Sequence, residues 1–360
     1  MARGINKVFI SRSGFAEIVF ASASLVAGCS TVGYYSQAID GQLTILARRQ
    51  PIDEVIADPA TTPELKQKLQ HVVAMRRFAV DSLDLPNNAS YTSYVDLERS
   101  YVVWNVFAAP EFSLTPLQWC YPVAGCVSYR GYFSEDDANR FADKLASDGN
   151  EVYVAGISAY STLGWFHDPL LNTMLTRSEA SLAGTLFHEL AHQRLYARGD
   201  TAFNESFATT VELEGVRQWL QKNGREGQYT GYQTTLERKL QFIALVQDAR
   251  EKLKTLFATD MPDQQKRKGK EEIYVELKQD YRQLREQWGG YTGYDAWFAR
   301  DLNNAHLVPI GSYYDYVPAF QALLNRHQGN LKAFYESAEK LAELKPGARH
   351  EALEQLLPKP

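Results

Sequence analysis

The stretch that decides the fold is His188-Glu189-Leu190-Ala191-His192, which lies in a predicted helix over residues 178–197. Because an α-helix has 3.6 residues per turn, a spacing of four residues places both imidazoles on one face, one turn apart. Two histidines in this arrangement suit a single divalent metal ion, and Glu189 beside them can reach a water bound to that metal. We therefore predict a metal site with His188 and His192 as ligands and Glu189 as the general base.

The residues around the motif are apolar: Leu182, Ala183, Leu186, Phe187, Leu190, Ala191 and Leu195. Burying two imidazoles and a carboxylate among them without a metal would be costly in free energy. The alternative interpretation is a surface helix whose histidines are satisfied by solvent and neighbours.

The third ligand has to come from outside the motif. A metzincin, one class of zinc peptidase, would have glycine at position 195 and histidine or aspartate at position 198, but this chain has Leu195 and Arg198. Residues Gly199-Asp200-Thr201 instead break the helix and cap a second one, which carries Asn204-Glu205. The metzincin class is therefore excluded.

The Asn204-Glu205-x-x-Ala208 arrangement resembles the gluzincins, zinc peptidases whose third ligand is a glutamate on the helix after the motif helix. The resemblance implies that Glu205 joins the two histidines and that each chain binds one Zn²⁺. Two histidines, a glutamate and a water form an open, catalytic zinc site. Thr209 and Glu212 follow on the same face of that helix, either as support for the ligands or as a plain polar face.

Segments such as residues 120–126 and 317–320, together with the motif and Asn204-Glu205, resemble a family of predicted bacterial zinc aminopeptidases that are exported lipoproteins. The resemblance implies a zincin-like (gluzincin) metallopeptidase fold, a peptide substrate and zinc-dependent peptide-bond hydrolysis. The chain lacks the Gly-x-Met-Glu-Asn segment that binds the substrate amine in well-known gluzincin aminopeptidases. The segments that carry the resemblance are residues 120–126, 129–133, 160–165, 168–169, 188–192, 204–205, 303–305, 313 and 317–320.

The oxyanion formed during hydrolysis needs a hydrogen-bond donor besides zinc. Gluzincins supply a tyrosine or histidine from the region after the zinc helices. Tyr313 holds the family-like position before Val317, and we predict it to be catalytic. Tyr314, Tyr316 and His306 are the alternatives, and the tyrosine cluster would otherwise be structural.

The N-terminus is typical of an export signal: three basic residues precede a short apolar stretch over residues 15–27. The stretch ends in Leu25-Val26-Ala27-Gly28-Cys29, which resembles the lipobox of bacterial lipoproteins, where the cysteine is acylated. We predict a lipoprotein signal peptide over residues 1–28 and a lipid anchor on Cys29. Ser30, rather than an aspartate, follows the cysteine, which favours the periplasmic face of the outer membrane within the bacterial cell envelope. An ordinary secretory signal is the alternative.

Cys120 and Cys126 enclose a short segment with Pro122 and Gly125 near its ends. Because an exported protein folds in an oxidising compartment, we predict a local disulfide between these two cysteines. Two buried thiols are the alternative.

The remaining pattern predicts an α+β, mostly α-helical fold. Helices are predicted over 34–48, 62–82, 134–146, 178–197, 201–222, 232–258 and 268–287, and strands over 101–107, 126–133 and 151–155. The basic run Lys266–Lys270 is interpreted as a solvated turn between helices. We expect one peptidase domain over residues 29–360: helices and a small sheet in 29–177, and a helical zinc-binding and C-terminal part in 178–360.

With 38 Lys and Arg against 43 Asp and Glu, the chain has a net charge of −5, which argues against nucleic acid as a partner. The prediction is an envelope zinc metallopeptidase, most simply an aminopeptidase. Two alternatives stay open: an envelope endopeptidase or peptidoglycan stem-peptide hydrolase, and a non-catalytic zinc-binding lipoprotein scaffold.

Overall fold

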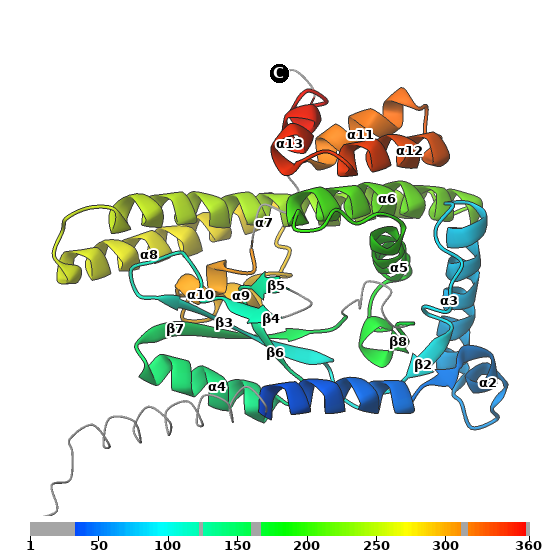
Figure 1. Cartoon of the computed structure of the whole chain (residues 1–360), viewed down its shortest axis with the longest axis horizontal. Coiled ribbons are helices and arrows are strands. Elements are labelled where there is room, and N and C mark those ends of the chain that lie inside the picture. The colour runs from blue at the N-terminus through cyan, green and yellow to red at the C-terminus, as the bar shows by residue number, and fades with distance from the viewer. Residues whose placement is uncertain (1–32, 122–124, 160–166, 311–315, 358–360) are drawn as a thin grey trace, which may run out of the picture. The chain divides into compact units, whose positions relative to one another are not determined.

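The computed structural model describes residues 33–121, 125–159, 167–310 and 316–357 (Figure 1). The chain divides into two compact units, Met1–Ala47 and Arg48–Pro360. In the first unit a helix covers residues 33–47, close to the predicted range. Among the helices that the structure describes, none combines the length and the apolar character needed to cross a bilayer.

The second unit begins with two helices and a small sheet. The α3 helix starts with Pro63 in its first turn, and the hydroxyl of Thr62 accepts the backbone N–H of Leu65 as its cap. In the sheet, β2 pairs antiparallel with β1 and parallel with β8. Because β8 continues through a short 3₁₀ turn into the motif helix, this sheet anchors the start of that helix. The bounds are β1 Gln50–Pro51, α2 Ile52–Ala57, α3 Pro63–Asp81, β2 Ser93–Val95, β8 Leu170–Leu171 and the 3₁₀ turn Asn172–Met174.

The largest contiguous strand pairing lies in an antiparallel sheet of order β6-β3-β7. The central strand β3 (Val103–Pro110) is almost wholly buried, with β6 (Arg130–Tyr132) and β7 (Asn150–Ile157) on either side. The α4 helix (Glu135–Ser147) packs on this sheet, and Ser134 caps it as the sequence predicts.

The predicted strand over 126–133 is wrong as a single element. Its first part is β5 (Gly125–Val127), which pairs only with β4 (Trp119–Tyr121) among the described strands, and its second part is β6 of the larger sheet. Continuous β-propensity cannot reveal that two halves of a segment pair with different partners. The disulfide between Cys120 and Cys126 is present and joins directly opposite residues of the β4–β5 hairpin.

The two helices that carry the motif residues are α5 (Glu179–Arg194) and α6 (Thr201–Lys222). Ser178 caps α5, and Asp200 caps α6 by accepting the backbone N–H of Phe203. The connection contains Gly199 with φ of +77°, a conformation that L side chains rarely adopt. The predicted start of α6 is confirmed, whereas α5 ends three residues before the predicted residue 197.

The helices α7 (Gly227–Phe257) and α8 (Asp263–Gln287) pack against each other around a second apolar core. The predicted solvated turn over Lys266–Lys270 is wrong, because these residues form the first turns of α8. Arg267 binds the carboxylate of Glu111 at 2.6 and 2.9 Å, and the buried Lys270 donates to the backbone carbonyl of Glu111 and to Glu151. The local charge pattern could not show acidic partners more than a hundred residues away.

After α8, the described residues form five short helices: α9 Asp295–Phe298, α10 Asn304–Leu307, α11 Val317–Arg326, α12 Leu331–Ala342 and α13 Pro346–Glu354. The α10 helix packs on β3 and β7, and α11 packs on α6. Aromatic rings fill the contact between α6, α11 and α12, with Phe207 stacked on Phe334 at 5.7 Å between ring centroids. The predicted class, α+β and mostly helical, is confirmed (Figure 1).

Candidate metal centre

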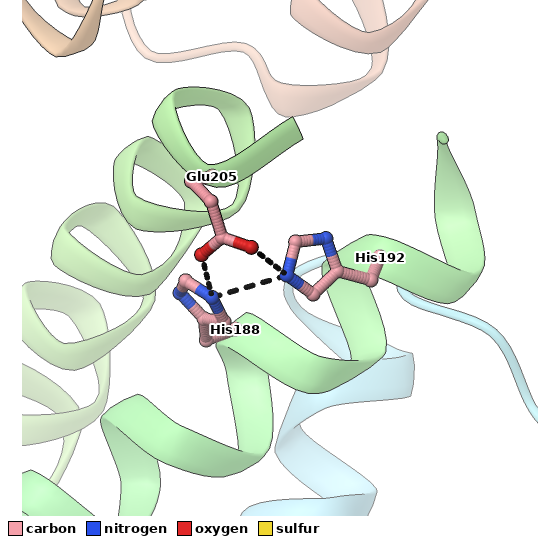
Figure 2. A group of neighbouring side chains, drawn as sticks. All are labelled: His188, His192 and Glu205. Carbon is pink, nitrogen blue, oxygen red and sulfur yellow. Dashed lines mark hydrogen bonds and ion pairs between the residues drawn. The ribbon is translucent and has the colours of Figure 1, made fainter. Parts of the chain in front are cut away.

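Three predicted ligands, His188, His192 and Glu205, come together between α5 and α6 (Figure 2). The Nε2 atoms of the two histidines lie 3.1 Å apart. The carboxylate of Glu205 points at both of them: its Oε2 atom lies 3.2 Å from Nε2 of His188, and its Oε1 atom lies 3.5 Å from Nε2 of His192. The sequence spacing of the motif thus produces the shared face on α5, and α6 supplies a carboxylate opposite it.

These distances fit a tetrahedral metal ion. Ligand bonds of about 2.0–2.1 Å in a tetrahedral zinc site separate neighbouring ligand atoms by about 3.3 Å, and the three contacts measure 3.1, 3.2 and 3.5 Å. Two imidazole nitrogens and a carboxylate are ligands that zinc commonly takes. The side chain of His192 is only 6% exposed and that of Glu205 is 31% exposed. The cluster is therefore sheltered on the side of α5 and more open on the side of α6.

Close packing of α5 and α6 depends on a glycine in the middle of α6. A Cβ at Gly215 would lie 2.7 Å from the ring of Phe187 and 2.8 Å from the side chain of Leu83. Phe187 precedes the first ligand, and its side chain is fully buried. A glycine inside a helix costs about 1 kcal/mol relative to alanine. Here it allows the two helices to approach each other.

Asn204 ties the connection between the two helices to the start of α6. Its side chain is buried and makes two hydrogen bonds with Ala197: the backbone N–H donates to Oδ1 at 2.7 Å, and Nδ2 donates to the backbone carbonyl at 2.9 Å. Because Glu205 is the next residue, this pair of bonds fixes the backbone from which the third ligand projects.

The start of α6 is also bound by the C-terminal helix α13. The carboxylate of Asp200 accepts hydrogen bonds from Arg349 and His350, each at 2.8 Å, besides the one from the N–H of Phe203. Burial acts to raise the pKa of Asp200, but these hydrogen bonds hold it below its usual value. The cap of the ligand helix is thus a charged, buried contact with the last helix of the chain.

Glu212 supports the site by binding His188. Its Oε2 atom lies 2.9 Å from Nδ1 of His188, on the side of the ring opposite the metal cluster. Its other oxygen accepts the hydroxyl of Tyr232 from α7. Thr209, which shares the face of α6 with Glu212, has a buried hydroxyl that makes no hydrogen bond with the described residues. Thr209 and Glu212 are both candidates, from the sequence, for supporting the ligands. Of the two, Glu212 contacts a predicted ligand, His188.

The charges of the cluster suit a divalent cation. Burial acts to lower the pKa of His188, but hydrogen bonds with Glu205 and Glu212 raise it well above its usual value. Burial and the neighbouring charge of His188 lower the pKa of His192 to about 4. Burial acts to raise the pKa of Glu205 and of Glu212, yet their contacts with His188 hold both below the usual range. The ionised carboxylate of Glu205 and the neutral imidazole of His192 therefore face the candidate metal position, and the ionised carboxylate of Glu212 lies behind His188.

Glu189, the predicted general base, lies on α5 beside His188 and is half-buried. The cluster of ligand atoms in the described part of the chain does not include its carboxylate.

Tyr91, which sequence reasoning missed, is a buried residue near Glu189. Its burial raises the pKa of its hydroxyl, and the charges of Glu189 and Asp168 raise that pKa further. Tyr91 also has a φ of +60°, unusual for a non-glycine residue, and its N–H donates to the carbonyl of Asp168 at 2.7 Å.

The predicted oxyanion donor Tyr313 and its alternative Tyr314 lie outside the described residues, as does the predicted lipidation site Cys29. Tyr316 is described, and its backbone N–H donates to the hydroxyl of Ser206 at 3.2 Å, next to Glu205. His306 instead takes part in the capping box of α10 and stacks on Tyr153 of β7, with 4.2 Å between ring centroids.

Residues 33–353 match the family described as "Putative aminopeptidase". The chain belongs to this family. The match extends from the first described helix to the penultimate residue of α13, so it includes both helices of the metal centre. Membership supports peptide hydrolysis and a peptide substrate. Separate comparisons with curated proteins and with solved structures found no match.

Proposed function

We propose that this protein is a zinc-dependent metallopeptidase of the bacterial cell envelope, with a zincin-like fold of the gluzincin kind and aminopeptidase activity. The observation that carries the proposal is the convergence of His188, His192 and Glu205 at distances that fit one tetrahedral zinc ion. Membership in an aminopeptidase family supports the reaction type.

The residues divide into ligands and a proton acceptor. His188, His192 and Glu205 would hold the metal. Bound zinc lowers the pKa of a water molecule to about 7 and polarises the peptide carbonyl. Glu189 takes the proton of the attacking water and passes it to the leaving amine, as a general base and then a general acid. Tyr313 would donate a hydrogen bond to the oxyanion, and the support for this role is its family-like position before Val317.

The peptide substrate would pair with the segment from Gly156 to Trp165, which begins in the last two residues of β7. This strand lies at an edge of its sheet in the order that the described strands form, with β3 as its neighbour on the other side. An extended peptide adds to such an edge through backbone hydrogen bonds. The sequence predicts this role for the segment that starts at Gly156, of which residues 160–166 lie outside the described residues.

We further propose that Cys29 is acylated and anchors the protein to the periplasmic face of the outer membrane. The support is the run Leu25-Val26-Ala27-Gly28-Cys29 after a basic and apolar N-terminus. Several acyl chains anchor a protein firmly without a membrane-spanning helix.

One experiment separates metal binding from chemistry. Glu189→Gln keeps the shape of the side chain but cannot accept the proton, so zinc content should stay near one per chain while turnover falls about 10²–10⁴-fold. Glu205→Gln should lower zinc content and turnover together. Glu214→Gln is the matched control, because Glu214 lies on the same helix but binds Arg217 and Gln218. Full zinc affinity in Glu205→Gln would contradict the ligand assignment.

A second experiment determines the type of peptidase. A peptide library is digested with the zinc-loaded protein, and the products are identified by mass spectrometry. Stepwise loss of N-terminal residues is the expected result. Internal cuts would instead identify an endopeptidase or a hydrolase of peptidoglycan stem peptides. If the protein binds zinc but cleaves no peptide, the result would favour the non-catalytic scaffold.

A further inference from the structure

Three helices meet on the side of His188 that faces away from the metal cluster. Nδ1 of His188 on α5 binds Oε2 of Glu212 on α6 at 2.9 Å. The hydroxyl of Tyr232, on α7, donates to Oε1 of the same carboxylate. Each oxygen of Glu212 therefore has its own partner, and its carboxylate is oriented from two sides.

A glycine on α5 makes room for this contact. Gly184 lies one turn before His188, and a Cβ there would lie 2.5 Å from the hydroxyl oxygen of Tyr232 and 3.2 Å from Oε1 of Glu212. Gly184 is in the interior of α5, where glycine is unfavourable relative to alanine by about 1 kcal/mol. An alanine would force the hydroxyl of Tyr232 away from its acceptor.

The chemistry of this contact bears on the metal. An ionised carboxylate only accepts hydrogen bonds, so the proton of a neutral His188 ring must sit on Nδ1. The lone pair of Nε2 then points into the cluster with His192 and Glu205, as a zinc ligand requires. The second hydrogen bond, from Tyr232, holds the carboxylate of Glu212 in the orientation in which Oε2 faces Nδ1 of His188.

We propose that Tyr232, in the space left by Gly184, is a positioning residue that holds Glu212 on Nδ1 of His188 and thereby sets the zinc affinity of the site. The inference rests on the proposed zinc centre and adds residues from a third helix to it. It assigns Tyr232 no contact with substrate.

The test compares Tyr232→Phe with Tyr229→Phe. Tyr229 is the matched control, because it lies on the same helix, is also half-buried and neighbours Glu214 rather than Glu212. Zinc affinity is measured by competition with a chelator. Tyr232→Phe should bind zinc about tenfold more weakly, the loss expected for one hydrogen bond to a charged acceptor. Tyr229→Phe should bind zinc as the wild-type protein does.

Two further measurements distinguish positioning from a general loss of structure. In the zinc-loaded protein, the Nδ1–H proton of His188 should give a downfield NMR signal that shifts in Tyr232→Phe and stays in place in Tyr229→Phe. Gly184→Ala should also weaken zinc binding. However, the two losses should not add in the double variant Gly184→Ala/Tyr232→Phe, because the closest clash, with the hydroxyl of Tyr232, is gone and only the approach to Glu212 at 3.2 Å remains.

Equal zinc affinity in Tyr232→Phe and Tyr229→Phe would overturn this inference and leave the proposed function intact. Additive losses from Gly184→Ala and Tyr232→Phe would also overturn it, because the glycine would then act independently of the tyrosine. A wild-type protein that does not bind zinc would overturn the proposed function and this inference together.

Discussion

Replacing Asn204 by alanine should damage both the stability of the protein and its metal site. The side chain of Asn204 is 1% exposed and satisfies the backbone N–H and carbonyl of Ala197, which is itself 3% exposed. Asn204→Ala leaves the backbone N–H of Ala197 buried without this partner. It also removes one of two hydrogen bonds to the carbonyl of Ala197, which still accepts the N–H of Asp200 at 3.2 Å. The unsatisfied N–H costs about 1–3 kcal/mol and the other lost hydrogen bond about 0.5–1.5 kcal/mol, so the free energy of unfolding should fall by about 1.5–4.5 kcal/mol.

The assay is urea denaturation in the presence of a metal chelator, followed by far-UV circular dichroism, so that lost metal binding does not contribute. Zinc affinity is then measured separately and should also fall, because Glu205 projects from the backbone that Asn204 fixes. Asn223→Ala is the control: Asn223 is exposed, and its side chain binds one carbonyl, that of Trp219.

A loss below about 0.5 kcal/mol in Asn204→Ala, the range of ordinary surface substitutions, would refute this reasoning. Equal losses in Asn204→Ala and Asn223→Ala would refute it too. A lower stability with unchanged zinc affinity would show that the connection between the helices does not set the position of the third ligand.

Three other predictions concern separate parts of the chain. Because the pKa of Asp200 is held below its usual value, its contribution to stability is present above about pH 4 and is lost as the pH falls through the lowered pKa. The difference in unfolding free energy between wild type and Asp200→Asn should therefore shrink as the pH is lowered from 5 to below 4, and a constant difference would contradict the assignment. Cys120 and Cys126 should resist alkylation until reduced, and free thiols in the native exported protein would count against the disulfide. Cys29→Ser should release the protein from membranes or stall its processing, as measured by fractionation, and unchanged anchoring would argue against acylation.

Local signals in the sequence predict the elements that position the site. Ser134 with its acidic first turn predicts α4, and Gly199-Asp200-Thr201 predicts the break before α6. Both signals act within one helical turn, so the residues that carry them are adjacent in the sequence. The same holds for the two motif histidines, whose common face follows from the helix period alone.

Contacts between distant residues could not be predicted in this way. Arg349 binds Asp200 across 149 positions, and Tyr232 binds Glu212 across 20. Nothing in the neighbourhood of either residue indicates its partner. The only local sign is Gly184: a glycine in a helix interior, one turn before the motif, indicates that another group approaches closely at that point.

The contact between Arg349 and Asp200 also links the order of synthesis to the appearance of the metal centre. A ribosome produces the N-terminal part of a chain first, so the two histidines and Glu205 emerge well before residue 349. Until α13 arrives, the carboxylate that begins the ligand helix lacks the guanidinium that binds it. The nascent chain thus carries the three candidate ligands before Asp200 has its contact with Arg349, so the start of α6 gains this partner only when synthesis is nearly finished.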